Sequence, residues 1–288
     1  MRTPLLSVCV ITYNHASFIR QAIDSVLMQE LDFTWEIIIA DDCSTDGTRE
    51  ILLEYKAKYP DLIKLILQGE NVGPSRNWYD LIYSTNSKYI AYLEGDDYWI
   101  DNKKLKTQYE HLENQPNINM CLHNAKLVNI KGDVIQDNII NSTISMKILD
   151  FNEIMNLPFP SSSIFFRNQR CVLDILFKSK DYYRLRLGDL ELKYIFKAFG
   201  DIYYIDKHYS VYRKNANGLS NTNIFNQYSQ IERFKIILPF LNDKDRNSLI
   251  IKIKSHYHYL FFIFFKKKEV KKILLLVMSY FHFAIIKK

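Results

Sequence analysis

The stretch that decides the fold runs from residue 88 to 101 and reads KYIAYLEGDDYWID. Its first half, 88–93, is a hydrophobic run rich in β-forming residues and predicts a buried strand. Three carboxylates follow, at Glu94, Asp96 and Asp97. Like charges this close resist ionisation unless a positive group joins them. The partner is a metal ion, a set of arginine and lysine side chains, or solvent, and the flanking sequence has to distinguish these three.

The chain before this stretch alternates between strand and helix patterns. Strands are expected at 5–11, 35–40, 62–67 and 88–93, and helices at 16–29, from Gly47 to before Pro60, and at 74–84. The first helix places Ile19, Ile23 and Val26 on one face. Strands that alternate with helices predict a parallel, doubly wound α/β sheet.

Polar residues follow three of the four expected strands. Thr12, Tyr13 and Asn14 come after the first strand, Asp41 and Asp42 after the second, and Glu94 to Asp97 after the fourth. In sheets of this kind, ligands bind outside the carboxyl ends of the strands. The sequence therefore predicts one site, built from three separate segments.

The pattern changes after Asp101. A helix is expected at 101–115 with Leu105, Tyr109 and Leu112 facing inward, and mixed strands at about 119–130 and 161–167. A further helix is expected at 188–200, and two short strands at 201–206 and 209–213. From about Asn223 the chain has a helical pattern to residue 288.

Composition and charge exclude several classes of protein. The chain is 48% hydrophobic, which argues against a disordered protein, and its four cysteines form no CxxC pair, which fits a reducing compartment. Residues 252–288 carry nine lysines against one acid, Glu269, so the net charge of +6 belongs to the tail and does not indicate a nucleic-acid binder. The uncharged run 273–286 is shorter than the ~20 residues of a membrane span. The tail is either a helix on an anionic membrane or a set of helices packed on the rest of the chain.

Four stretches together carry a resemblance to a known family: SVCVITYNHASFIRQAIDSVLMQ (7–29), EIIIADDCSTDGT (36–48), NVGPSRN (71–77) and YLEGDDYW (92–99). They resemble the family-two glycosyltransferases with the GT-A fold, strongly over about 5–110 and more weakly at 187–206 and 209–220. The resemblance implies a mostly parallel, Rossmann-like sheet flanked by helices in a catalytic domain, 1–222. Residues 1–100 would be its nucleotide-sugar half and 101–222 its acceptor half, followed by a helical extension at 223–288.

The family transfers a sugar from a nucleotide diphosphate donor, inverts the anomeric carbon and uses Mn²⁺ or Mg²⁺. The resemblance makes Asp96 the metal ligand, and the first position of the family's D-x-D pattern is Glu94 here. Asp97 would contact the ribose or orient the loop. A metal held by carboxylate oxygens suits this chemistry, because negative charge builds on the leaving phosphates.

The resemblance also assigns the donor contacts. Asp42, with Asp41 as the alternative, would accept a hydrogen bond from the imide N–H of uracil or thymine. Thr12, Tyr13 and Asn14 would lie beside the base, with Tyr13 either stacked on the base or packed in the core. Arg76 would reach the donor or lie solvated on its helix.

Asp189 in GDLEL is the expected catalytic base, since inversion needs a carboxylate to accept the acceptor hydroxyl's proton. Gly188 precedes it where the family often has Glu, and Asp189 also suits a helix cap. Glu191 is the reserve base. Arg213 and Lys214 are expected either at the diphosphate or on a surface turn, and His123 and His208 receive no role.

The resulting expectation is transfer of one sugar, from a UDP-hexose or UDP-N-acetylhexosamine, to a saccharide or lipid-linked acceptor of bacterial surface-glycan synthesis. QIERF at 230–234 misses the Q-x-x-R-W of processive members by its Phe. The expected location is the cytoplasm, at the inner face of the membrane if the tail binds lipid. The alternatives are a non-catalytic nucleotide-sugar binder and a sugar-nucleotide pyrophosphorylase, although the glycine-rich N-terminal loop of the latter is missing.

Overall fold

The computed structural model describes residues 3–140, 144–179, 189–214 and 225–286. The chain divides into two compact units, Met1–Asn215 and Ala216–Lys288. Both this division and the expected one at 222/223 fall within 215–224, outside the described residues. Each unit is described by itself.

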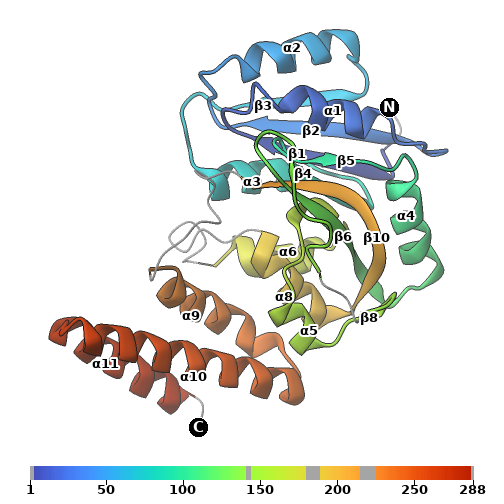
Figure 1. Cartoon of the computed structure of the whole chain (residues 1–288). Helices are drawn as coiled ribbons and strands as arrows, with labels where there is room; N and C mark the ends of the chain where they lie inside the picture. The colour runs from blue at the N-terminus through green and yellow to red at the C-terminus, as the bar shows by residue number, and fades with distance from the viewer. Residues whose placement is uncertain (1–2, 141–143, 180–188, 215–224, 287–288) are drawn as a thin grey trace. The chain divides into compact units, whose positions relative to one another are not determined.

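The first unit begins with the four expected parallel strands. They are β1 (Leu6–Thr12), β2 (Trp35–Asp41), β3 (Ile63–Leu67) and β4 (Tyr89–Glu94), in the order β3-β2-β1-β4. The connecting helices are α1 (Ile19–Leu27), α2 (Thr48–Lys58) and α3 (Pro74–Tyr83). Figure 1 shows α1 and α2 on one side of these strands and α3 on the other. The doubly wound sheet predicted for this part of the chain is confirmed.

The strand register brings the polar strand ends together. Thr12 pairs with Asp41 across β1 and β2, and Ile11 pairs with Glu94 across β1 and β4. The chain order reverses between β1 and β4, which is the switch point where such sheets bind ligands. The segments after β1, β2 and β4 therefore lie at one edge.

The rest of the sheet mixes directions. After β4 the order continues β9-β6-β10-β5, with β7 pairing β6 and β8 pairing β10. These strands are β5 (Tyr98–Trp99), β6 (Ile118–Asn129), β7 (Val134–Gln136), β8 (Lys147–Ile148), β9 (Phe165–Arg167) and β10 (Asp201–Lys214). The helices of this part are α4 (Lys104–Asn114), α5 (Phe151–Asn156), α6 (Arg170–Phe177) and α8 (Asp189–Phe199).

Two details differ from the expected strands. The two short strands at 201–206 and 209–213 form one continuous strand, β10, because register shifts between Ile205 and Ser210 absorb the irregular residues without breaking the pairing with β6. The strand expected at 161–167 begins only at Phe165, because Ser161–Ser163 form a 3₁₀ turn.

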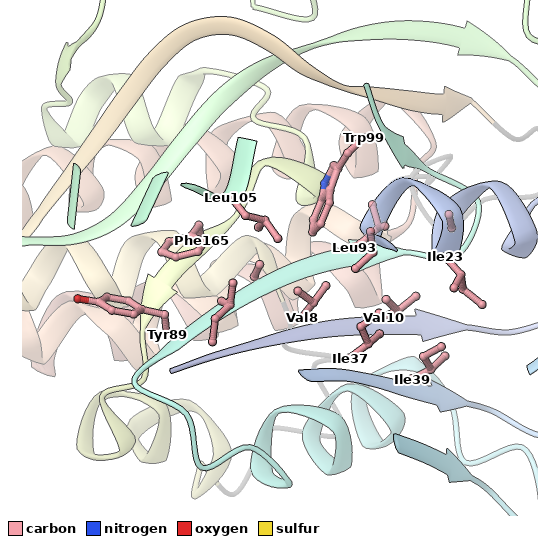
Figure 2. Close-up of a cluster of buried hydrophobic side chains, with 14 of the residues drawn as sticks. Val8, Val10, Ile23, Ile37, Ile39, Tyr89, Leu93, Trp99, Leu105 and Phe165 are labelled. Atoms are coloured by element: carbon pink, nitrogen blue, oxygen red, sulfur yellow. The ribbon is translucent and has the colours of Figure 1, made fainter. Parts of the chain in front are cut away.

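A core of branched and aromatic side chains holds the strands in place. Val8 and Val10 of β1 pack among residues of β2 and β4, including Ile37 and Leu93, with Ile23 of α1 over them (Figure 2). All five are fully buried, and such side chains contribute ~1.5–3 kcal/mol each. Their tight packing fixes the strand ends from which the site is built.

The second unit contains α9 (Phe225–Ile237), α10 (Asp243–Lys266) and α11 (Val270–Ile286), as the helical pattern predicts. The hydroxyls of Tyr257 and Ser279 lie 2.8 Å apart and join α10 to α11. Leu260 and Leu276 are buried. Across the described part of the chain, every helix is too short or too polar to cross a membrane.

Candidate functional site

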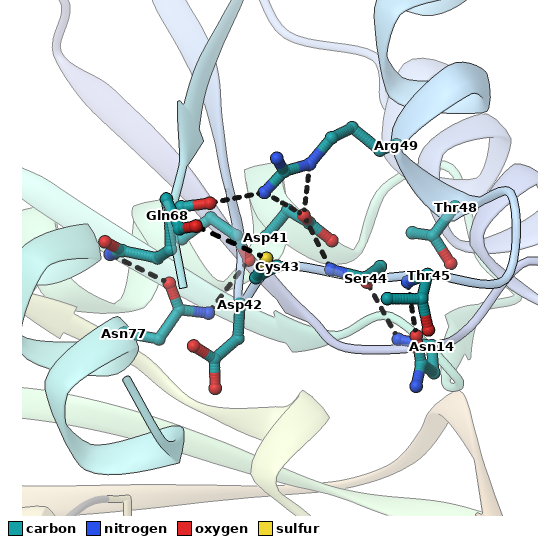
Figure 3. Close-up of polar contacts among 12 residues, drawn as sticks. Asn14, Asp41, Asp42, Cys43, Ser44, Thr45, Thr48, Arg49, Gln68 and Asn77 are labelled. Atoms are coloured by element: carbon teal, nitrogen blue, oxygen red, sulfur yellow. Dashed lines mark hydrogen bonds and ion pairs between the residues drawn. The ribbon is translucent and has the colours of Figure 1, made fainter. Parts of the chain in front are cut away.

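Asn14 joins the loops that follow β1 and β2. It has a positive φ of 55°, its N–H donates to Ser44 Oγ at 2.9 Å, and its Oδ1 accepts from the Thr45 N–H at 2.9 Å (Figure 3). Asparagine tolerates this left-handed conformation better than most residues. Asn14, expected beside the donor base, therefore uses its side chain to hold two loops of the site together.

Asp41 is fully buried, and its carboxylate accepts hydrogen bonds from other groups of the protein. Its Oδ2 accepts from Arg49 Nε at 2.9 Å and from the Ser44 N–H at 3.1 Å. The same guanidinium donates to the carbonyl of Gln68. This ion pair closes the loop after β2 and leaves Asp41 facing the interior.

Asp42 points to the opposite side of the same loop, as Figure 3 shows. Its Oδ1 accepts from the Val72 N–H at 2.7 Å, just before α3. Burial raises the pKa of this carboxyl group, while backbone N–H groups of Val72 and Gly73 act against the shift. Asp42 is thus a carboxylate whose position is fixed by backbone from a neighbouring loop.

The other expected donor contacts lie near these loops. Thr12 is buried, and its Oγ1 has no hydrogen-bond partner among the described residues. Tyr13 is 45% exposed, so its ring is not a core residue. Arg76 lies on the surface of α3 with its Nε 3.0 Å from the carboxylate of Asp80, one helical turn later.

The loop after β4 is packed tightly against the loop after β1. A Cβ atom on Gly95 would lie 2.8 Å from Thr12 Oγ1 and 2.9 Å from His15 Nδ1, so a larger residue does not fit without rearrangement. Asp96 follows, with its Oδ2 3.8 Å from His15 Nε2 and its side chain 15% exposed. Glu94 is the last residue of β4.

Asp97 is buried, and β10 holds it in place. Its Oδ1 accepts from the Arg213 N–H at 2.8 Å, and its Oδ2 has no partner among the described residues. Burial raises the pKa of Asp97 well above its usual range, and the charges of Asp96 and Glu94 add to the shift. Of the two roles expected for Asp97, this placement favours orientation of the loop.

Arg213 is the positive group that meets the acidic loop. Its Nε donates to the carbonyl oxygen of Asp96 at 2.8 Å, and its Nη2 donates to Gln21 Oε1 at 2.6 Å. The guanidinium also lies 4.8 Å from the ring centroid of Phe18 and 5.1 Å from that of Tyr98. Arg213 is therefore a buried residue of β10 and does not lie on a surface turn, whereas Lys214 is exposed at the end of the strand.

Gln21, Phe18 and His15 were not predicted from the sequence as parts of the site. Phe18 and Gln21 are three residues apart at the start of α1, so they share a helix face. Gln21 is exposed and lies beside Asp24 on this helix, so no feature of the sequence distinguishes it from a solvated residue. His15 follows Asn14 directly, and nothing in its local pattern distinguishes it from a solvated loop residue.

The loop after β4 suits a metal that the ligand itself helps to bind. Among the described residues, no group of three or more His, Cys, Asp and Glu side chains is arranged to hold an ion alone. Mg²⁺ is commonly held by one or two carboxylates together with substrate phosphates. A single partly exposed carboxylate, that of Asp96, fits this arrangement.

The expected catalytic base lies at the edge of the described chain. Asp189 is the first residue of α8, and its side chain lies outside the described residues. Glu191, the reserve base, is 1% exposed. His123 is buried with its Nδ1 2.7 Å from the Asn124 carbonyl, and His208 contacts Asn138, so both have structural contacts.

A family model described as glycosyl transferase family 2 matches residues 7–176. The putative teichuronic acid biosynthesis glycosyltransferase TuaG of Bacillus subtilis is 38% identical over 109 residues, which cover 38% of this chain and 42% of TuaG. The uncharacterized protein Rv1520 of Mycobacterium tuberculosis is 40% identical over 123 residues, covering 43% of this chain and 36% of that protein. The chain thus spans well under half the length of these curated relatives.

Solved structures share the fold at low sequence identity. Staphylococcus aureus TarS 1–349 in complex with UDP-GlcNAc aligns with a TM-score of 0.67 and 19% identity, covering 88% of this chain and 72% of that one. The mannosyltransferase PcManGT of Pyrobaculum calidifontis, in complex with GDP-Man and Mn²⁺, aligns with a TM-score of 0.58 and 16% identity, covering 91% and 71%. These likenesses confirm the expected GT-A fold.

Proposed function

The chain belongs to glycosyl transferase family 2, and we propose that it transfers one sugar from a UDP-hexose or UDP-N-acetylhexosamine to a saccharide or lipid-linked acceptor, with inversion at the anomeric carbon. The observation that carries the proposal is the pair of aspartates, Asp42 and Asp96, which follow β2 and β4 on either side of β1 at one edge of the sheet. Each has a neighbour, Asp41 or Asp97, that is buried and held by protein groups.

Asp42 would read the base of the donor. Its fixed carboxylate can accept the imide N–H of uracil, a discrimination of ~1–3 kcal/mol when the bond is buried. The exposed ring of Tyr13 is available to stack on the base. TarS binding of UDP-GlcNAc supports uracil, whereas PcManGT binds GDP-Man, so the base has to be tested directly.

Asp96 would hold Mn²⁺ or Mg²⁺, in agreement with the Mn²⁺ of PcManGT. When bound, the ion neutralises charge on the leaving diphosphate. The chain's own contribution is to fix the loop. Arg213 binds the Asp96 carbonyl and Asp97 binds the Arg213 N–H, so the loop has its shape before ligand arrives. Glu94 would contact the sugar or the ribose.

Asp189 would accept the proton of the acceptor hydroxyl as that oxygen attacks the anomeric carbon. The burial of Glu191 supports this choice, because a side chain that is 1% exposed cannot reach an acceptor without movement. Asp189 begins α8, where a carboxylate also stabilises the helix N-terminus.

The curated relatives suggest the pathway in which the chain acts. TuaG is described as acting in teichuronic acid biosynthesis and GgaA of Bacillus subtilis in minor teichoic acid biosynthesis. Cell-surface polysaccharide assembly is therefore the proposed pathway, on the cytoplasmic side of the membrane. A sugar-nucleotide pyrophosphorylase is disfavoured by the family match.

The deciding experiment offers UDP-, dTDP- and GDP-sugars to the purified chain with Mn²⁺, with Mg²⁺ and with EDTA, together with a panel of glycan acceptors. We expect release of UDP from one UDP-sugar, dependent on metal and stimulated by acceptor, and a product of inverted anomeric configuration by NMR. Release of GDP from GDP-sugars, without release of UDP from UDP-sugars, would contradict the assignment of Asp42 to the uracil base. Ligand binding without turnover on any acceptor would favour the non-catalytic binder.

A further inference from the structure

The end of the α10–α11 hairpin, residues 261–278, exposes an unusual amount of apolar surface. Its exposed members range from Phe261 at 42% to Met278 at 68%, and they are Phe261, Phe262, Phe265, Val270, Leu274, Leu275 and Met278. We call residues 261–278 the hairpin tip. So many large, exposed apolar side chains within one short segment point to a site of interaction with a protein or a membrane.

The hairpin tip also concentrates positive charge. Lysines stand at 266, 267, 268, 271 and 272, against one acid, Glu269. Glu269 is paired with Lys272 at 3.0 Å. Lys266 Nζ lies 4.5 Å from the ring centroid of Phe262, so charge and aromatic surface occupy the same part of the tip.

We propose that the hairpin tip docks on the surface of an anionic lipid bilayer, with its phenylalanines at the acyl boundary and its lysines among the headgroups. Exposed phenylalanine and leucine side chains insert at the boundary between headgroups and acyl chains, and nearby lysines add attraction to anionic lipids.

A second copy of the chain is the alternative partner for the hairpin tip. The charge of the tip favours an anionic lipid surface over this alternative. A contact between two tips would bring the lysines of both copies close together, and like charges brought together in an interface are unfavourable. An anionic surface instead gains ~1 kcal/mol per lysine near the headgroups, which is about fivefold in affinity each. The lysines therefore favour the membrane.

The test is cosedimentation of the full chain with vesicles of phosphatidylcholine alone and of phosphatidylcholine mixed with phosphatidylglycerol. We expect binding only to the anionic vesicles, weakened at high salt because screening shortens the reach of the lysines. Phe262→Ser/Phe265→Ser should reduce binding about tenfold or more. Lys266→Gln/Lys267→Gln/Lys268→Gln should reduce it on the order of 100-fold.

Ile251→Ser is the matched control, because Ile251 is 68% exposed on the same helix but outside the tip. This variant should bind as the unaltered chain does, and all variants should melt normally. Two results overturn the proposal. One is failure of the unaltered chain to bind anionic vesicles. The other is a dimer in sedimentation velocity that Phe262→Ser/Phe265→Ser converts to monomer, which would assign the tip to a contact between copies.

Discussion

Two adjacent aspartates stand at the end of β2, and two more follow β4. In each pair we assign one aspartate to anchoring the loop and the other to the ligand, but the order along the chain is opposite. After β2 the first aspartate, Asp41, is the buried anchor and the second, Asp42, points away from it. After β4 the second, Asp97, is the anchor and the first, Asp96, is partly exposed. Asp96 and Asp97 lie in the turn after β4, so the contacts of each carboxylate, not the alternation of a strand, distinguish the two tasks.

The comparison teaches that the two anchors are held in different ways. Asp41 is held by an ion pair with Arg49. Asp97 is instead held by a backbone N–H, as Asp42 is. Arg49, the partner of Asp41, stands eight residues along the chain. Arg213, whose N–H holds Asp97, stands 116 residues away. The variants below test this division of tasks, from the largest expected effect to the smallest.

Asp96→Ala should abolish most metal-dependent turnover. Stabilisation of the leaving diphosphate by a bound ion is worth several kcal/mol, or about 10³–10⁵-fold in rate. Melting should be unchanged, because Asp96 uses its backbone carbonyl, not its side chain, to bind Arg213. Initial rates at varied Mn²⁺ measure the effect, and full activity would remove Asp96 from the metal site.

Asp189→Asn should lower kcat by ~10²–10⁴-fold while UDP affinity stays the same. Asparagine keeps the size and capping oxygen of aspartate but cannot accept the proton. A pure capping role predicts near-normal turnover and a loss of at most ~0.5–2 kcal/mol of stability.

Glu191→Gln is the control for that variant, since Glu191 is buried. It should retain most activity. If Glu191→Gln were inactive and Asp189→Asn active, the catalytic base would be Glu191. The roles proposed for Asp189 and Glu191 would then be exchanged.

Asp41→Asn should reduce the free energy of unfolding by about 1.5–3 kcal/mol, the range for hydrogen bonds to charged groups. It weakens the bonds from Arg49 and Ser44 that close the loop after β2. Asp42→Asn should leave it nearly unchanged, because Asn Oδ1 can still accept from the Val72 N–H. Chemical denaturation of both variants gives the comparison, and equal losses would mean that Asp41 is no more an anchor than Asp42.

Lys104 offers the contrasting case of a buried amine without a counter-ion. Its Nζ lies 3.7 Å from the ring centroid of Trp99 and has no hydrogen-bond partner among the described residues. Burial lowers the pKa of Lys104 well below its usual range. Lys104→Met should therefore raise the free energy of unfolding at pH 7 by about 1 kcal/mol, because the folded chain no longer has to bury an amine that the unfolded chain keeps protonated.

The pH dependence of this gain has a definite sign. Between the lowered folded pKa and the ordinary value of 10.5, the unfolded chain binds the proton and the folded chain does not. The cost of Lys104 is thus relieved as pH rises through that window, and the advantage of Lys104→Met should shrink towards pH 10.5. An advantage that is independent of pH would mean that Lys104 titrates normally in the folded chain.

Local pattern was sufficient for the donor half of the fold and insufficient for its site. Continuous apolar runs such as 35–40 and the turn residues around them predict β1 to β4 and their helices, because parallel strands buried on both faces leave that signature. The pattern does not predict that β10 continues through 206–209, since its register shifts depend on β6. It predicts that Asp41, Asp42, Asp96 and Asp97 lie near a ligand. Which of them are anchors depends on Arg49 and Arg213, which only the folded chain brings near.

The most direct test is titration of UDP, in the presence of Mn²⁺, into Asp41→Asn, Asp42→Asn, Asp96→Asn and Asp97→Asn, each with its melting curve. The proposed division of tasks predicts that Asp42→Asn and Asp96→Asn lose ~1–3 kcal/mol of binding free energy, which lowers UDP affinity by about 5–150-fold. Both variants should melt normally. Asp41→Asn should lose stability, and Asp97→Asn should keep its affinity because Asn Oδ1 still accepts from the Arg213 N–H. Normal UDP affinity in Asp42→Asn and Asp96→Asn, with the loss confined to normally melting Asp41→Asn or Asp97→Asn, would contradict it.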